Sequence, residues 1–348
     1  MKKEIQISLK DLIETIGVSV LIFNNSLTLE FFNESAKKLI PDLKEKSAAE
    51  AIFNSKRISS QILECLKTGK TEFRRIRYKT NEGTEVAVNI KLLELEGDNL
   101  AIVTLNDLSP LSEAKMMRSD FVSNVSHEIR SPLTSIIGFV ETLQGPAGDD
   151  INKREKFLEI ISKEASRMTN LVSDLLSLSL VEAKEKRKVK GRVNPEEIVR
   201  LAFESLKPEA KKKGKEIKIK LAKDIPEIPG HHDNLLRVLI NLIENSINYS
   251  RDKSVITISM KRISEEAEFL TPGVKITVSD KSDGISPEEI PRLTERFYRV
   301  DRSRSRDMGG TGLGLAIVKH ILVRHRGKLS IDSVLGKGSD FSIYLPLT

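Results

Sequence analysis

Two consecutive segments of the chain each carry apolar residues along one helical stripe, and this pattern restricts the fold most. The first stripe comprises Val122, Val125, Ile129, Leu133, Ile136, Val140 and Leu143, and the second comprises Phe157, Ile161, Ala165, Met168, Val172, Leu175 and Leu178. Spacings of three and four predict two amphipathic helices. The intervening GPAGDD, residues 145–150, predicts a hairpin loop in which Asp150 or Asn152 can cap the second helix. One hairpin cannot cover both stripes, so the pattern predicts a homodimer that forms a four-helix bundle.

A single histidine lies on the polar face of the first predicted helix, in the sequence VSNVSHEIRSPLTSIIGF. On a helical wheel His127 falls nearly opposite the apolar stripe, Ser131 shares its outward face, and Glu128 flanks it. A zinc-protease helix is excluded, because that motif requires a second histidine at position 131. Pro132 removes one intrahelical hydrogen bond and predicts a bend. Spacing alone leaves open whether His127 is a solvated surface residue or meets a partner.

Length, charge and cysteine content narrow the class of protein. The 348 residues leave room for two to three domains, and the single cysteine, Cys65, fits a reducing compartment without disulfides. The net charge of +7 comes from 57 basic and 50 acidic residues spread along the chain, so no nucleic-acid partner is predicted. The longest apolar run near the start, residues 16–23, is too short to span a membrane, and there is no secretory signal. We therefore expect a cytoplasmic location.

Residues 1–108 alternate short apolar runs with turns and short helical pieces. The runs VSVLIF, TLEFF, FRRIRY, VAVNIKLLEL and LAIVTLND have strand spacing, whereas SAKKLI and ISSQILECL are typical of helices. This order predicts a small antiparallel sheet flanked by short helices, which is an α+β fold. The five histidines all lie outside this segment, so it cannot bind haem through histidine. A docking or dimerising module and a small-molecule sensor both remain open.

Residues 190–348 mix helices and strands and place three asparagines on one helix. A helix is predicted from about Asp233, and Asn241, Asn245 and Asn248 recur on it at spacings of four and three. Their neutral amides suit Mg²⁺ held beside phosphates, although a polar face on a surface helix has the same spacing. Asp280 follows a strand-like run, where a buried carboxylate could accept a hydrogen bond from an adenine amino group; an ordinary turn aspartate is the alternative.

A glycine-rich turn, GTGLGL at residues 310–315, precedes a predicted apolar helix. Glycines at a helix start let backbone N–H groups approach a polyphosphate. The turn lacks the GK[ST] ending of a P-loop and does not follow the opening strand of a Rossmann unit, so a nucleotide site built from separated pieces remains. The stretch before it carries arginines at positions 292, 296, 299, 302, 304 and 306, which suit a mobile lid over a triphosphate or a solvated loop.

Taken in order, these motifs resemble those of sensor histidine kinases. The matching phrases are SHEIRSPLT, NLIENSINYS, SDKSDGI, RLTERFYRVD, GTGLGLAIVKHI and GKGSDFSIYLP, and they extend over roughly two thirds of the chain. GFVETLQGPAGDD and the arginine-rich stretch look most like the phosphate-regulon sensor kinases of α-proteobacteria. The first segment, with FFNESAKKLI and the closing LND, resembles a PAS sensor domain. The resemblance implies a PAS-like domain at 1–108, a dimerisation and phosphotransfer hairpin at 109–186, and an α/β Bergerat-type (GHKL) ATP-binding domain at 190–348.

The resemblance also implies roles for individual residues. His127 would attack the γ-phosphate of ATP while Glu128 accepts or orients the proton on the other ring nitrogen, and the phosphoryl group would pass to an aspartate on a response-regulator receiver domain. Asn245 would hold Mg²⁺, Asp280 would read adenine, and Ser131 would position water for dephosphorylating the regulator. The nucleotide site would be lined by Asn241, Asn248, Tyr249, Gly284, Arg296, Arg299, Gly310, Thr311, Gly312, Leu313 and Gly314.

Three positions depart from the family pattern. Ser282 replaces the first glycine of DxGxG, where its Cβ can weaken nucleotide binding; Asn248 replaces a common lysine; and Thr294 replaces an aromatic residue. Ser282 favours an alternative class, a non-catalytic phosphotransfer or adaptor dimer with a decayed ATP site, whereas Asn245 and Asp280 argue against it. A chaperone- or topoisomerase-type ATPase on the same nucleotide fold leaves the hairpin and His127 unexplained.

Overall fold

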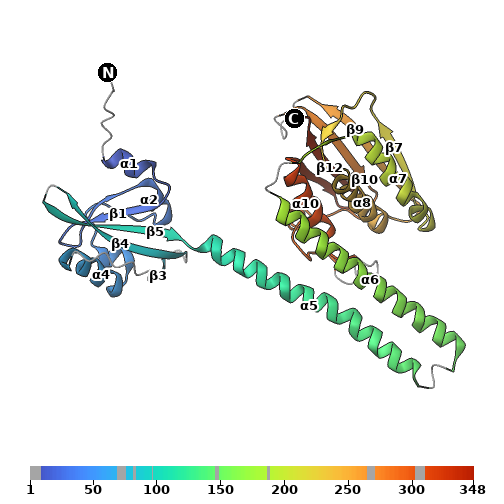
Figure 1. Ribbon diagram of the computed structural model, residues 1–348, viewed down its shortest axis with the longest axis horizontal. Helices are drawn as coiled ribbons and strands as arrows, with labels where there is room; N and C mark the ends of the chain where they lie inside the picture. Colours follow the sequence, from blue (N-terminus) through green and yellow to red (C-terminus); the bar gives the residue numbers. More distant parts are fainter. Residues whose placement is uncertain are drawn as a thin grey trace. The chain divides into compact units, whose positions relative to one another are not determined.

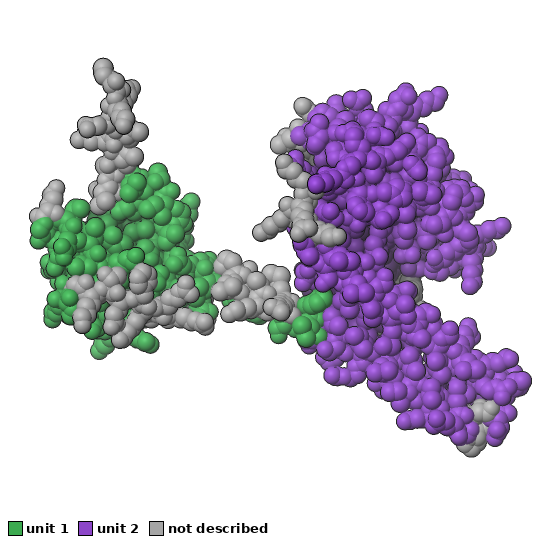
Figure 2. Space-filling model, viewed as in Figure 1, with its two compact units in different colours: residues 1–122 green, residues 123–348 purple. Residues whose placement is uncertain are grey.

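The computed structural model forms two compact units, residues 1–122 and 123–348 (Figure 2). It describes residues 9–68, 76–80, 84–95, 97–145, 149–185, 189–264, 271–301 and 310–348. The boundary between the two units falls within the helix Ser109–Leu143, which is described below. The proposed division into domains at 109–186 and 190–348 remains a prediction.

Unit 1 contains a five-stranded antiparallel sheet (Figure 1). Its strands are β1 (Ser19–Phe23), β2 (Leu29–Phe32), β3 (Ile76–Lys79), β4 (Glu85–Leu95) and β5 (Asp98–Asp107). The strand order is β2-β1-β5-β4-β3, so the first and last strands of the chain segment pair at the centre of the sheet. This confirms the antiparallel sheet predicted from the alternating apolar runs.

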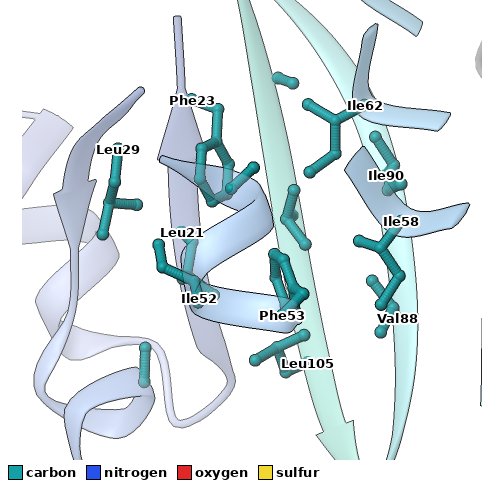
Figure 3. Packing of buried hydrophobic residues seen from close by; sticks show 14 of the residues in the cluster. Leu21, Phe23, Leu29, Ile52, Phe53, Ile58, Ile62, Val88, Ile90 and Leu105 are labelled. Carbon is teal, nitrogen blue, oxygen red and sulfur yellow. The ribbon is translucent and has the colours of Figure 1, made fainter. Parts of the chain in front are cut away.

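Four short helices accompany this sheet: α1 (Leu9–Thr15), α2 (Glu34–Leu39), α3 (Ala49–Phe53) and α4 (Lys56–Thr68). Side chains of α3 and α4 interdigitate with those of the strands, as Phe53, Ile58 and Phe23 show in Figure 3. Phe53 also packs edge-on against Tyr78, with ring centroids 5.6 Å apart. Cys65 is buried in the same core, and burial raises the pKa of its thiol, so the group favours the neutral form.

Asn33 is fully buried and ties α1 to the sheet of unit 1. Its side-chain oxygen accepts the N–H groups of Ala36, which caps α2, and of Val20 in β1, both at 3.0 Å. Its nitrogen donates to the carbonyl of Ile13 in α1 at 3.1 Å and to that of Val18 at 2.9 Å. One amide thus forms hydrogen bonds with backbone groups of three elements. These bonds offset the free-energy cost of removing the amide from water.

The two apolar stripes form the long helices α5 (Ser109–Leu143) and α6 (Ile151–Lys184), as predicted. Asp150 caps α6, because its carboxylate accepts the N–H groups of Asn152 and Lys153. α5 continues on both sides of Pro132, and the predicted bend there stays a prediction.

Within the hairpin the stripes cover each other only in part. Phe139 packs on Phe157 with ring centroids 5.1 Å apart. By contrast, Leu133, Val140 and Val172 remain 44%, 40% and 47% exposed. Apolar exposure of this extent along one face is typical of a surface that another element covers, as the predicted four-helix bundle requires.

Unit 2 also contains a mixed five-stranded sheet in the order β11-β12-β10-β9-β7 (Figure 1). The strands are β7 (Glu216–Leu221), β9 (Val255–Ile263), β10 (Gly273–Ser279), β11 (Lys328–Val334) and β12 (Gly338–Pro346), and a separate pair is formed by β6 (Arg192–Val193) and β8 (Ile228–Pro229). β7 and β9 run parallel, whereas the other neighbours are antiparallel.

Three helices cover one face of this sheet: α7 (Pro195–Lys212), α8 (His232–Tyr249) and α10 (Gly314–Arg324). α7 contacts β7, α8 contacts β10, and α10 contacts β11, while α8 lies between the other two. α8 buries its apolar side, including Leu239, Leu242 and Ile243, against the sheet. The opposite side of α8 is therefore available for polar groups. A short 3₁₀ turn, η2 (Ile290–Arg292), precedes the arginine-rich stretch.

Candidate functional site: a nucleotide-sized cavity beside the helical hairpin

Three asparagines of α8 line one cavity of about 1060 Å³ in unit 2. Asn241, Asn245 and Asn248 lie one turn apart on the side of α8 that faces away from the sheet core. The Nδ2 atom of Asn241 is buried without a hydrogen-bond partner among the described residues. A buried amide of this kind is typically satisfied by a ligand or water. The size of the cavity suits a nucleoside triphosphate.

The cavity brings together most of the site residues predicted from the sequence. Besides the asparagines, it is lined by Tyr249, Asp280, Gly284, Arg299, Gly310, Thr311, Gly312 and Gly314. Arg296 and Leu313 are not among its lining residues. Leu313 is fully buried and precedes α10 as its N-cap, so it packs rather than contacts a ligand.

The carboxylate of Asp280 accepts hydrogen bonds from the residues around it. The N–H groups of Ser282 and Ser339 both donate to Oδ1, at 2.9 and 3.2 Å. Burial raises the pKa of Asp280 above its ordinary value, and a hydrogen bond from the Ser282 hydroxyl together with the two from backbone N–H groups opposes the rise only in part. Asp280 also lines the cavity, where its carboxylate can accept a hydrogen bond from an adenine amino group.

The raised pKa of Asp280 predicts a pH effect on nucleotide binding. Its pKa in the folded chain lies above the unfolded value, so protonation stabilises the folded state as the pH falls. The same protonation removes the acceptor that adenine needs. We expect ATP affinity to fall as the pH is lowered, beginning above the range, about pH 4, in which ordinary carboxylates titrate. Calorimetry at a series of pH values from neutral to acidic tests this expectation; a flat profile in wild type would contradict it, and Asp280→Asn should show no such dependence.

Ser282 fits the loop that follows Asp280 without strain. Its backbone is outside the left-handed region that favours glycine. Its hydroxyl accepts the N–H of Gly284 at 3.3 Å and lies 3.3 Å from the hydroxyl of Ser339. The replacement of glycine therefore adds contacts that hold the loop around Asp280, rather than the steric cost expected from the sequence.

Gly284 is required by its surroundings. Its φ is +75°, and an added Cβ would lie 2.3 Å from the carbonyl oxygen of Val334. We expect Gly284→Ala to lower the free energy of unfolding of unit 2 by about 2 kcal/mol or more, since strain and a backbone clash add. Gly336 is the matched control, because its φ is +79° with nothing within 4 Å of an added Cβ. Denaturant unfolding should show a smaller loss for Gly336→Ala; equal losses would contradict the clash.

The glycine-rich turn leads directly into α10, as predicted. Gly312 has a φ of +73°, and an added Cβ would lie 2.9 Å from Cα of Phe297, so the turn packs closely on the arginine-rich stretch. The hydroxyl of Thr311 accepts the N–H of Leu313 at 3.2 Å. It also donates to Asp174 of α6 at 2.7 Å, which links the turn to the hairpin.

Two arginines of the predicted lid contact carboxylates of the hairpin. Arg296 donates to Glu182 of α6 at 2.5 Å. Arg299 is only 6% exposed and lies 4.0 Å from the carboxylate of Glu128. Arginines 302, 304 and 306 lie outside the described residues.

The predicted phosphoacceptor face lies on α5, apart from the cavity lining. His127 and Ser131 are exposed, as the helical wheel predicted. Glu128 is half-buried, and Arg167 of α6 donates to its carboxylate at 2.8 Å. The arrangement leaves the imidazole of His127 open to an incoming partner and fixes the neighbouring carboxylate.

The contacts between α6 and the nucleotide side of unit 2 were not predicted from the sequence. Asp174 accepts from Arg237 of α8 at 2.6 Å as well as from Thr311. Glu182 and Glu185 flank His320 of α10, at 3.3 and 3.0 Å. In the sequence, Asp174 and Glu182 lie on the same face of α6 as the buried Leu178, which indicates that this face contacts another element. The spacing does not identify the residues that the acids contact.

Two family matches cover more than half of the chain. Residues 117–184 match the His Kinase A phospho-acceptor domain, and residues 230–348 match the histidine kinase-, DNA gyrase B- and HSP90-like ATPases. The first match covers the helical hairpin, and the second covers the cavity with α8, Asp280 and the glycine-rich turn. Fold and site thus define a phosphoacceptor hairpin joined to a GHKL-type ATP-binding domain.

Curated relatives give the same result. The chain is 38% identical over 256 residues to the phosphate regulon sensor protein PhoR of Pseudomonas aeruginosa, with 72% of this chain and 55% of PhoR covered. It is 33% identical over 274 residues to the sensor histidine kinase WalK of Bacillus subtilis, covering 77% of this chain and 43% of WalK. The chain thus spans about half the length of these relatives. It belongs to the sensor histidine kinases of two-component systems.

A solved structure supports the fold over nearly the whole length. The histidine kinase ThkA, solved in complex with the response regulator protein TrrA, aligns with a TM-score of 0.53 at 20% identity, covering 98% of this chain and 99% of ThkA. Within the part of the chain that the structure describes, every helix is too short or too polar to cross a membrane.

Proposed function

We propose that this protein is an ATP-dependent histidine kinase that phosphorylates His127 and passes the phosphoryl group to an aspartate of a response-regulator receiver domain. The single observation that supports this most is the cavity that gathers Asn245, Asp280 and the glycine-rich turn within the same unit as the exposed His127. The relatives' names and the family matches support the same reaction. We place it in the cytoplasm, where ATP is available.

The proposed reaction has simple requirements. A ring nitrogen of His127 forms a bond to the γ-phosphorus, the bond from that phosphorus to the bridging oxygen of ADP breaks, and the proton on the other ring nitrogen is oriented or accepted by Glu128. Catalysis then depends on in-line placement and neutralised charge. Arg299, near Glu128 and lining the cavity, is placed to stabilise charge between the two sites.

Magnesium fits the donors of the cavity. The amide oxygen of Asn245 is a ligand of the kind that Mg²⁺ accepts, and phosphate oxygens complete its coordination in such sites. Within the described residues, no group of three His, Cys, Asp or Glu side chains could hold a metal by itself. Bound Mg²⁺ would neutralise the phosphates, and Asn245 would orient it.

We further propose that two copies pair through the hairpin into a four-helix bundle. The exposed apolar residues of α5 and α6, such as Leu133 and Val172, support this, because pairing would cover them. Unit 1 is proposed to be a PAS-like input domain, supported by its antiparallel sheet of order β2-β1-β5-β4-β3. Ser131 keeps a hydroxyl on the outward face one turn after His127, which supports dephosphorylation of the regulator as a second activity.

The input is proposed to be phosphate limitation. The support is the likeness to the protein named phosphate regulon sensor protein PhoR. A host lacking this chain is expected to lose induction of its phosphate-starvation genes; unchanged induction would exclude this input without affecting the kinase assignment.

The experiment that tests the proposed reaction is labelling of the full chain with γ-labelled ATP and Mg²⁺. We expect a protein-bound label that is labile in acid and stable in alkali, as a phosphoramidate is, and that moves to a receiver domain. Steady ATP hydrolysis without label would instead favour a chaperone- or topoisomerase-type ATPase. Absence of ATP binding would favour the non-catalytic adaptor.

A further inference from the structure

The turn after α7 brings a lysine to the nucleotide cavity. Lys213, the C-cap of α7, donates to the side-chain oxygen of Asn248 at 2.7 Å and to Glu209 at 2.8 Å. Lys213, Glu209 and Asn248 all line the cavity. Asn248 stands where related kinases commonly carry a lysine. The ammonium of Lys213, which comes from another segment, therefore lies beside a position at which a positive charge is common in the family.

This turn is anchored to the end of α8. Gly214 adopts a φ of +66°, which reverses the chain, and Lys215 is then 9% exposed. The ammonium of Lys215 donates to the carbonyls of Ile247 and Ser250, at the C-terminal end of α8, where a cation is favoured. Lys215 therefore fixes the backbone of the turn next to Asn248, and the Lys213 side chain, which is 42% exposed, extends from this anchored turn.

The charges around the cavity favour a role for Lys213. In the described structure the cationic residues that line it are Lys213, Arg237 and Arg299. Arg237 is bound to Asp174 at 2.6 Å, and Arg299 lies 4.0 Å from Glu128. Lys213 donates to a neutral amide and to Glu209, which is 41% exposed, and an ammonium has three N–H donors. If Lys213 gave up its contact with the exposed Glu209 carboxylate to bind a phosphate oxygen, little free energy would be lost.

We propose that Lys213 binds the phosphates of the nucleotide and supplies the positive charge that position 248, an asparagine here, does not provide. This rests on the proposed function, since it assigns a phosphate contact within the same site. Asn248 lies one helical turn from Asn245, the proposed Mg²⁺ ligand, and this spacing is what assigns Lys213 to the phosphates. The adenosine measurement below tests that assignment against the end of the cavity marked by Asp280. A surface i,i+4 ion pair with Glu209 alone would not require the bond to Asn248.

The test measures nucleotide affinity of the full chain by calorimetry with Mg²⁺. Lys213→Ala should weaken ATP about tenfold or more, because a charge-assisted phosphate contact is lost, while adenosine affinity stays unchanged. Lys212→Ala is the matched control, because Lys212 is the neighbouring exposed residue and the substitution also removes one positive charge. This control should bind ATP and adenosine as wild type does. Equal ATP affinity of Lys213→Ala and Lys212→Ala would overturn the proposal, as would a parallel loss for adenosine, which indicates structural damage.

A second variant tests whether a positive charge in this part of the cavity is sufficient, whichever residue carries it. Asn248→Lys in the Lys213→Ala background returns a cation to the same part of the cavity and should restore most of the lost ATP affinity. No restoration would overturn the equivalence of the two positions. If wild type itself binds no ATP, the kinase function fails and this inference with it, whereas normal wild-type binding with an inert Lys213 refutes the inference alone.

Discussion

Substitution of His127 by glutamine is expected to abolish phosphoryl labelling of the protein, a loss of more than about a hundredfold, because the nucleophile is removed. The side chain is exposed and lies outside the cavity lining, so ATP affinity and stability should remain those of wild type. Labelling with γ-labelled ATP and calorimetry on the same preparation check both parts.

His232→Gln is the control for this result. His232 begins α8, and its side chain is 42% exposed beside Asp233. This variant should keep the label. Residual acid-labile label on His127→Gln, or an equal loss in the control, would place the phosphoacceptor elsewhere.

Asp280→Asn is expected to weaken ATP binding at least about a hundredfold with little change in folding. The oxygen Oδ1 that accepts the N–H groups of Ser282 and Ser339 can be kept by asparagine. The second oxygen becomes an NH₂ group, so a donor would face the adenine amino group, and a buried donor without a partner is costly. Calorimetry should therefore show a large loss of ATP affinity, whereas thermal unfolding should show little change in stability.

The base of the nucleotide gives a sharper version of this test. Inosine triphosphate carries a carbonyl where ATP carries the amino group, so Asp280→Asn should bind it better relative to ATP than wild type does. Asp340→Asn, an exposed carboxylate on the neighbouring strand β12, should leave the preference unchanged. An unaltered preference in Asp280→Asn would show that this residue does not read the base.

Local pattern was enough to predict much of this fold. The apolar stripes of α5 and α6, the cap at Asp150, which was one of two candidates, and the alternating apolar runs of unit 1 depend on residues close in sequence, where periodicity and capping chemistry decide. The helix from about Asp233 and the start of α10 after the glycines were predicted for the same reason.

The rest depends on segments far apart in sequence. The sequence did not reveal that Asp174 contacts both Arg237 and Thr311, because those residues lie 63 and 137 positions away. The Cβ of Ser282 was predicted to weaken nucleotide binding, and the sequence did not reveal that its hydroxyl contacts Ser339, which lies on the distant strand β12. Composition and spacing define which chemistry is present, whereas tertiary packing decides which groups meet.

The acidic face of α6 has a thermodynamic consequence. The side chains of Thr311 and Arg296 are bound to Asp174 and Glu182, so a ligand that requires either side chain competes with α6 for it. Linkage is reciprocal: such a ligand loosens the hairpin by the same free energy by which the hairpin weakens the ligand. A substitution on α6 that never touches nucleotide can therefore shift its apparent dissociation constant, and occupancy of the cavity becomes a measure of how tightly the hairpin is held.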